Sequence, residues 1–114
     1  KENYSTANDI AILASVSRKY PIVLDMVERE REIVNWSSES GLLSTEVLTT
    51  NKLFEDVKYV HGLKTGNTDL AGQCFVGYFI YPNGKELITV ILNSTDRFGD
   101  TKVIEGYARS ILKW

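Results

Sequence analysis

The segment from His61 to Gly72 holds the residues whose types and spacing could act on a substrate. An apolar run leads into Lys64, Thr65 and Gly66, which are a cation, a hydroxyl and a residue without a side chain. This order first suggests a phosphate-binding loop, but that motif needs glycine directly before lysine, where Leu63 stands. By composition alone the segment is a strand that exits into a glycine-rich turn. Its chemistry must therefore be inferred from what accompanies it.

The composition excludes several other kinds of site. Thirteen basic and fifteen acidic side chains give a net charge of −2, so no nucleic-acid partner is expected. The single histidine, His61, excludes a site with two imidazoles, and the single cysteine, Cys74, excludes an internal disulfide. We expect no metal and no cofactor. His61 is expected on a strand surface, and Cys74 is expected in apolar packing.

An ordered set of motifs accompanies the lysine. Lys64-Thr65-Gly66, Asn67-Thr68 and Ala71-Gly72 precede an apolar strand, and this order resembles the third motif of penicillin-recognising serine enzymes. More narrowly, it is similar to the D-alanyl-D-alanine carboxypeptidases of the low-molecular-weight penicillin-binding proteins. Other stretches resemble that family in order and spacing: Tyr4–Ala11, Thr50–Phe54, Leu87–Leu92 and Asp96–Phe98.

The resemblance implies a reaction and partners. Members of this family acylate a serine with a peptidoglycan peptide that ends in D-Ala-D-Ala, and they then hydrolyse the acyl-enzyme. It also implies that β-lactam antibiotics bind the complete domain. Export to the periplasm or the cell-wall side of the membrane is expected on the same ground alone.

The resemblance also assigns roles to individual residues. Lys64 would supply positive charge and orient a serine hydroxyl, and Thr65 would offer its hydroxyl to the substrate carboxylate. Gly66 would let substrate approach the strand, and the N–H of Asn67 would form half of an oxyanion hole. Thr68 is a weaker substrate-binding candidate. Arg97 is a carboxylate partner or a surface cation near a helix cap, and we favour the surface cation.

Two other motifs of the family are missing from this sequence. The only Ser-x-x-Lys is Ser110–Lys113, which follows the lysine motif instead of preceding it. Tyr81-Pro82-Asn83 has the composition of a second motif but falls in a predicted turn. We therefore expect residues 1–114 to be the C-terminal part of a transpeptidase-like domain. The N-terminal half of the same domain would pack against this chain as its partner and would hold the nucleophile. The polar opening of the chain is unlike a signal peptide, which suggests a mature or truncated piece.

Two other functions remain open. The chain could be a non-catalytic module that binds cell-wall peptides or another chain through the same strand. It could also belong to a serine β-lactamase, although Ala71-Gly72 and the loop at Asn51 favour the carboxypeptidase. The sequence upstream of this chain would separate an enzyme from a binding module.

The second half of the chain predicts a β-hairpin. Runs from Gln73 to Tyr81 and from Leu87 to Leu92 flank Pro82-Asn83-Gly84, where Asn-Gly favours a tight turn. A further strand is expected from Val57 to Leu63. Apolar residues occupy both faces of the hairpin strands, so helices must cover both faces of the sheet.

Two helices and a polar stretch are expected in the first half. The Ser5-Thr6 pair can cap the first helix, which ends near Lys19-Tyr20 because a proline follows. Residues Ile22–Val27 form a short second helix. After a charged run, Ile33–Trp36 suggests a short strand, and residues 37–52 are expected to form a long loop because they are rich in Ser, Thr, Glu and Asn.

A last helix completes the predicted fold. Asp96 or Asp100 can cap it, and its apolar stripe runs toward Trp114. Together these elements predict an α+β fold, in which helices cover both faces of an antiparallel sheet. The few predicted strands would form a sheet that is small for one with two apolar faces. We therefore expect an open edge and missing strands, as in a partial β-lactamase/transpeptidase-like domain.

Overall fold

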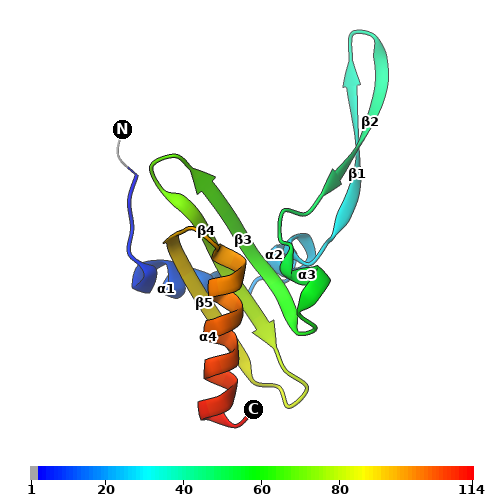
Figure 1. The fold of residues 1–114 in the computed structure, drawn as a ribbon. Coiled ribbons are helices and arrows are strands. Elements are labelled where there is room, and N and C mark those ends of the chain that lie inside the picture. Colours follow the sequence, from blue (N-terminus) through cyan, green and yellow to red (C-terminus); the bar gives the residue numbers. More distant parts are fainter. Residues whose placement is uncertain (1–2) are drawn as a thin grey trace.

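A three-stranded antiparallel sheet lies at the centre of the molecule. The computed structural model describes residues 3–114, and the first two residues of the polar opening lie outside the described part. The strand order is β3 (Val60–Thr68), β4 (Gly72–Ile80) and β5 (Glu86–Ser94), so β3 and β5 are the edges (Figure 1). The predicted α+β class with an antiparallel sheet is confirmed.

The predicted hairpin is formed by β4 and β5. In the turn, the N–H of Tyr81 donates to the carbonyl of Lys85 at 2.9 Å, and the N–H of Gly84 donates back to Tyr81 at 2.9 Å. Gly84 has a φ of +79°, a conformation that glycine adopts without steric cost. The Oδ1 atom of Asn83 accepts from the N–H of Lys85 at 3.1 Å. The Asn-Gly pair therefore closes the hairpin as expected.

Helix α4 (Arg97–Leu112) packs on one face of the sheet (Figure 1). Asp96 caps it, since its side chain accepts from the N–H of Gly99 at 3.0 Å. The ring of Phe98 meets that of Phe75 with centroids 5.3 Å apart. This contact belongs to the main core, whose buried members are Leu53, Val60, Phe75, Phe79 and Tyr81.

Helices α1 (Ala7–Ser17) and α2 (Pro21–Val27) come from the other end of the chain. α1 packs on β5 and β4, and α2 packs on β3. Just after α1, the Arg18 guanidinium lies 5.9 Å from the centre of the Tyr78 ring. Tyr78 points to the face opposite Phe75 and Phe79, because strand side chains alternate. Helices therefore contact both faces. None of the helices within residues 3–114 has the length and apolar composition needed to cross a bilayer.

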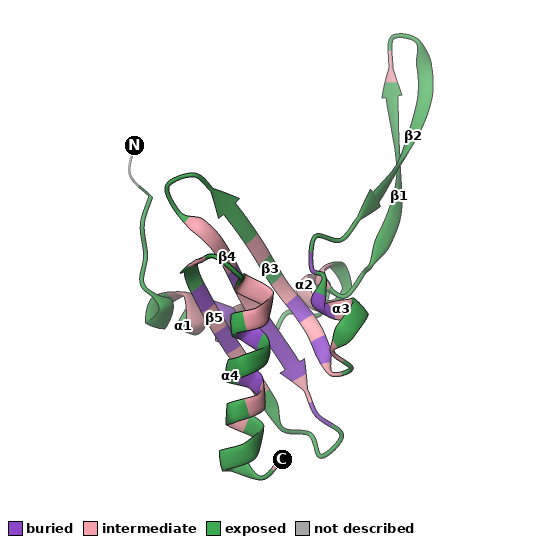
Figure 2. Ribbon diagram, in the orientation of Figure 1, coloured by how far each residue is buried: buried purple, intermediate pink, exposed green. Residues whose placement is uncertain are grey.

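The structure corrects the sequence-based prediction of a long loop for residues 37–48, whereas residues 49–52 lie outside any helix or strand, as expected. Strands β1 (Arg31–Ser38) and β2 (Gly41–Leu48) pair along their whole length and form a second, separate hairpin. It projects away from the sheet and is exposed almost throughout (Figures 1 and 2). Its polar composition suggested a loop, because a hairpin with no buried face needs no apolar alternation. The Ser38 hydroxyl holds the turn by accepting from the N–H of Ser40 at 3.3 Å.

A buried polar contact joins the end of β4 to α4. The hydroxyl of Tyr81 donates to Oε1 of Glu105 at 2.7 Å, and Nε of Arg109 lies 2.7 Å from the same oxygen. Burial, together with the hydrogen bond to Glu105, raises the pKa of the Tyr81 hydroxyl. The folded chain therefore holds this proton more tightly than the unfolded chain does. The resulting stability is complete below about pH 10, the ordinary tyrosine pKa, and is lost progressively above it.

Tyr81→Phe is expected to lower the free energy of unfolding by about 1–3 kcal/mol at neutral pH, because Glu105 loses a buried donor. Urea denaturation measures this change. Tyr107→Phe is the matched control, since Tyr107 is exposed, and its stability should stay close to the parent value. Above about pH 10 the parent should lose more stability than Tyr81→Phe does. Equal effects of the two substitutions would contradict this assignment.

Candidate functional site

The lysine motif lies inside strand β3, at a free edge of the sheet. The expectation that the strand ends at Leu63 is wrong, because pairing with β4 continues from Val60 to Thr68. Lys64 pairs with Val76, and Thr65 pairs with Phe75. Among the described residues, nothing pairs with the other side of β3. The segment is therefore an accessible edge strand rather than a strand exit.

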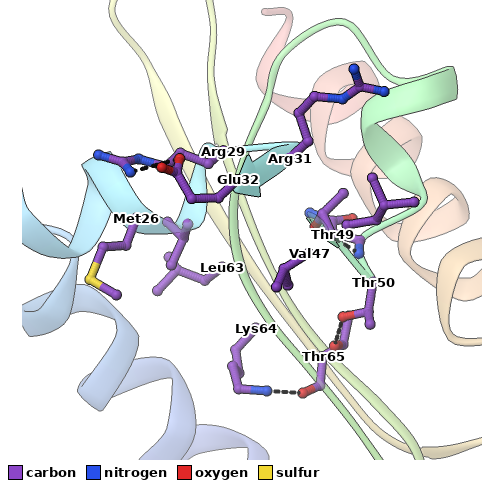
Figure 3. Close-up of a pocket in the computed structure, with 13 residues that line it drawn as sticks. Met26, Arg29, Arg31, Glu32, Val47, Thr49, Thr50, Leu63, Lys64 and Thr65 are labelled. Carbon is purple, nitrogen blue, oxygen red and sulfur yellow. Dashed lines mark hydrogen bonds and ion pairs between the residues drawn. The ribbon is translucent and has the colours of Figure 1, made fainter. Parts of the chain in front are cut away.

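A cavity of about 420 Å³ opens beside this edge (Figure 3). It lies between α2, the base of the β1–β2 hairpin and the Leu63–Thr65 part of β3. Met26, Leu63 and Val47 supply apolar surface, and threonine hydroxyls line the side near Lys64. The lining residues are Met26, Val27, Arg29, Arg31, Glu32, Val47, Leu48, Thr49, Thr50, Asn51, Leu63, Lys64 and Thr65.

Lys64 and Thr65 are brought together at the cavity. The exposed ammonium of Lys64 donates to the backbone carbonyl of Thr65 at 2.5 Å. The Thr65 hydroxyl lies 2.5 Å from the hydroxyl of Thr50, which comes from the segment after β2. A cation and a hydroxyl thus stand next to an open sheet edge, an arrangement suited to an anionic, extended ligand.

The other three candidates lie further along β3. Gly66 and Asn67 are exposed, and neither lines the cavity. The hydroxyl of Thr68 accepts from the N–H of Ala71 at 3.0 Å, so it supports the turn into β4. The structure therefore gathers two of the five candidates at the cavity and arranges the rest along the same edge.

Arg97 lies closer to the lysine motif than its sequence position suggests. The sequence favours a surface cation near the cap of a helix. In the structure, Nη1 of Arg97 donates to the carbonyl of Gly66 at 2.9 Å. Its backbone N–H also donates to Oε1 of Gln73 at 3.3 Å. The start of α4 is thereby attached to both β3 and β4. A guanidinium that reaches back across the sheet leaves no local pattern in the sequence.

His61 and Cys74 lie near the lysine motif but do not line the cavity. Nδ1 of His61 lies 2.8 Å from Oε1 of Glu28, at the surface between β3 and the end of α2. Cys74 is a free, half-buried thiol rather than a fully buried one. Within residues 3–114, no three His, Cys, Asp or Glu side chains are grouped as a metal would need.

Sequence reasoning missed the wall of the cavity opposite β3. Thr50 and Asn51 belong to the stretch Thr50–Phe54, which resembles the carboxypeptidase family, but the sequence assigns neither residue a role in binding or catalysis. Asn51 is only 6% exposed, and its Oδ1 accepts from the N–H of Leu53 at 3.1 Å. Its Nδ2 has no partner among the described residues. No local signal places these residues beside Lys64, because their proximity depends on how the hairpin returns to the sheet.

Solved structures identify the class of fold. The chain superposes on a variant of the Streptomyces K15 DD-transpeptidase with a TM-score of 0.89 and 25% identity, covering 96% of this chain and 44% of that one. It also matches penicillin-binding protein D2 from Listeria monocytogenes in its ampicillin-bound form, with a TM-score of 0.71 and 30% identity. There it covers 90% of this chain and 40% of the other. The fold is thus part of a transpeptidase-type fold, and the chain spans less than half the length of these proteins.

The family profile of the D-alanyl-D-alanine carboxypeptidases matches residues 1–96. The chain belongs to this family. The match includes both hairpins and the lysine motif, and it ends at the residue that caps α4.

A comparison of Gly66 with Gly77, another glycine of the sheet, shows whether internal packing requires glycine at position 66. A Cβ atom at Gly66 would lie 3.8 Å from the Cβ of Cys74, which is ordinary contact. A Cβ atom at Gly77 would lie 2.5 Å from Oγ1 of Thr89 and 2.9 Å from Cε2 of Phe79. Internal packing therefore requires glycine at position 77 but not at position 66.

Gly66→Ala is expected to change the free energy of unfolding by less than about 1 kcal/mol, because the site is exposed and unobstructed. Gly77→Ala should cost about 1–3 kcal/mol, because the new methyl group overpacks the sheet. Urea denaturation of both variants measures the difference. A large loss of stability in Gly66→Ala would mean that this glycine is needed by the fold itself.

Proposed function

We propose that this chain forms the substrate-binding strand of a serine D-Ala-D-Ala carboxypeptidase that acts on peptidoglycan stem peptides. The observation that carries the proposal is the free edge of β3, where Lys64 and Thr65 stand beside a cavity. The nucleophilic serine and the general base come, in this proposal, from a part of the domain outside these 114 residues. The protein acts in the periplasm or on the cell-wall side of the membrane.

The peptide binds as an additional strand along β3. Its backbone pairs with the unpaired edge, and Gly66 leaves room for that approach. The Thr65 hydroxyl donates to the terminal carboxylate, and the nearby Lys64 ammonium adds positive charge. The N–H of Asn67 then supplies one of the two donors to the oxyanion that develops at the carbonyl under attack.

The reaction proceeds through an acyl-enzyme. The serine oxygen bonds to the carbonyl carbon of the penultimate D-Ala, the peptide C–N bond breaks, and the terminal D-Ala leaves after its nitrogen takes up a proton. Water then adds to the ester carbonyl and releases the shortened peptide and the serine hydroxyl. The role of Lys64 is to keep positive charge beside the serine hydroxyl and to orient it during proton transfer.

β-Lactams are expected to acylate the same serine in the complete domain. Penicillin-binding protein D2, which this chain resembles, has been crystallised in cefotaxime-bound and ampicillin-bound forms. A β-lactam carboxylate would use the same contact with Thr65 as the terminal carboxylate of the peptide does.

Lys64→Ala in the complete protein is expected to slow acylation by a fluorescent penicillin by about 10²–10⁴-fold, as for loss of a group that takes part in proton transfer. The fold should persist, because the Lys64 side chain is exposed. The control is Lys85→Ala in the β4–β5 turn, which should leave the acylation rate unchanged. An unaltered rate in Lys64→Ala would remove this lysine from the mechanism.

The isolated 114-residue chain is expected to form no covalent adduct with penicillin. Its only Ser-x-x-Lys begins at Ser110, whose hydroxyl donates to the carbonyl of Tyr107 at 2.8 Å and does not line the cavity. Intact-protein mass spectrometry after incubation with ampicillin checks this expectation. A penicilloyl mass increase that disappears in Ser110→Ala would contradict it and place the nucleophile in α4.

A complete protein that binds stem peptides but is not acylated by penicillin would favour the non-catalytic module instead.

A further inference from the structure

The hydroxyl of Thr50 forms a hydrogen bond with the Thr65 hydroxyl, with the two oxygens 2.5 Å apart (Figure 3). Thr50 follows β2, and Thr65 lies on β3, so the contact joins the separate hairpin to the central sheet. Both residues line the cavity. The function proposed above uses only Thr65 of this pair.

The residues on both sides of Thr50 are fixed. The N–H of Thr49 donates to the carbonyl of Glu30 at 2.8 Å, which continues the β1–β2 pairing. Asn51 is buried and accepts from the N–H of Leu53, a residue of the main core. Thr50 therefore stands between two hydrogen-bonded residues, which hold its backbone beside β3.

The direction of the hydrogen bond between Thr50 and Thr65 determines whether Thr65 can donate to a ligand. Each hydroxyl has one hydrogen to donate and can accept from others. When Thr65 donates its hydrogen to a ligand carboxylate, only Thr50 can donate between the two. The hydrogen bonds then run from Thr50 to Thr65 and from Thr65 to the ligand, and bonds in such a chain strengthen one another.

We infer that Thr50 is a positioning residue that directs the hydrogen of Thr65 toward a free carboxylate of the ligand. The inference rests on the proposed function and deepens it: Thr50 makes the site selective for ligands that end in a carboxylate over the same ligands with a neutral end. It also gives the exposed hairpin a role, because the base of this hairpin holds Thr50 against β3.

The test compares two ligands that differ only in this group. The complete protein is acylated with ampicillin and with ampicillin methyl ester, and the ratio of the two acylation rate constants is measured. Because both rates come from the same preparation, a fraction of misfolded protein cancels in the ratio.

Thr50→Val removes the hydroxyl and keeps the shape of the side chain. We expect it to lower the acid-to-ester ratio about fivefold, which corresponds to the loss of about 1 kcal/mol from one hydrogen bond. The rate constant with the ester should stay within about twofold of the parent value. Thr50→Ser should restore the ratio, because it returns the donor without the methyl group.

The matched control is Thr45→Val, which lies on β2, five residues before Thr50, and outside the cavity. Its ratio should equal that of the parent. An unchanged ratio in Thr50→Val, or the same fall in Thr45→Val, would overturn the role of Thr50. If the parent protein is acylated by neither ligand, the proposed function itself fails and this inference falls with it.

Discussion

The pairing of β3 with β4 is the constraint on which the candidate site depends. Thr65 pairs with Phe75, whose side chain is 1% exposed and meets Phe98 of α4. The backbone that carries the lysine motif is therefore held by the strand at the centre of the core. Within residues 3–114, no strand pairs with the other edge of β3. Rigidity and accessibility thus come from opposite edges of one strand.

The second wall of the site depends on a short segment rather than on a large interface. After the exposed β1–β2 hairpin, the chain returns to the body at Asn51 and Leu53, both of which are buried. These anchors hold Thr50 within hydrogen-bonding distance of Thr65. A hairpin with almost no buried surface can contribute to a binding site in this way, because its base is fixed even though its strands are exposed.

The chain accounts for less than half the length of the structures it resembles. Its exposed apolar faces and open strand edges are consistent with such a partial domain. Apolar side chains such as Leu13 on α1 and Ile104 on α4 are exposed, and one edge of β5 pairs with no strand in the described part of the chain. Edges and apolar faces of this kind are normally covered in a complete domain. The proposed location of the nucleophile, outside these residues, fits the same physical picture.

The sequence by itself determined the local features. The Asn-Gly turn at Gly84 and the two apolar faces of β4 follow from backbone preference and side-chain alternation over a few residues. The sequence also limited the helix caps to Ser5 or Thr6 and to Asp96 or Asp100, and the structure selects Thr6 and Asp96. The tertiary structure decided the rest. Residues 37–48 belong to the β1–β2 hairpin although their composition suggested a loop, because backbone pairing between exposed strands requires no apolar alternation. The approach of Thr50 to Thr65 and of Arg97 to Gly66 depended on how distant segments pack, and no local pattern encodes that distance.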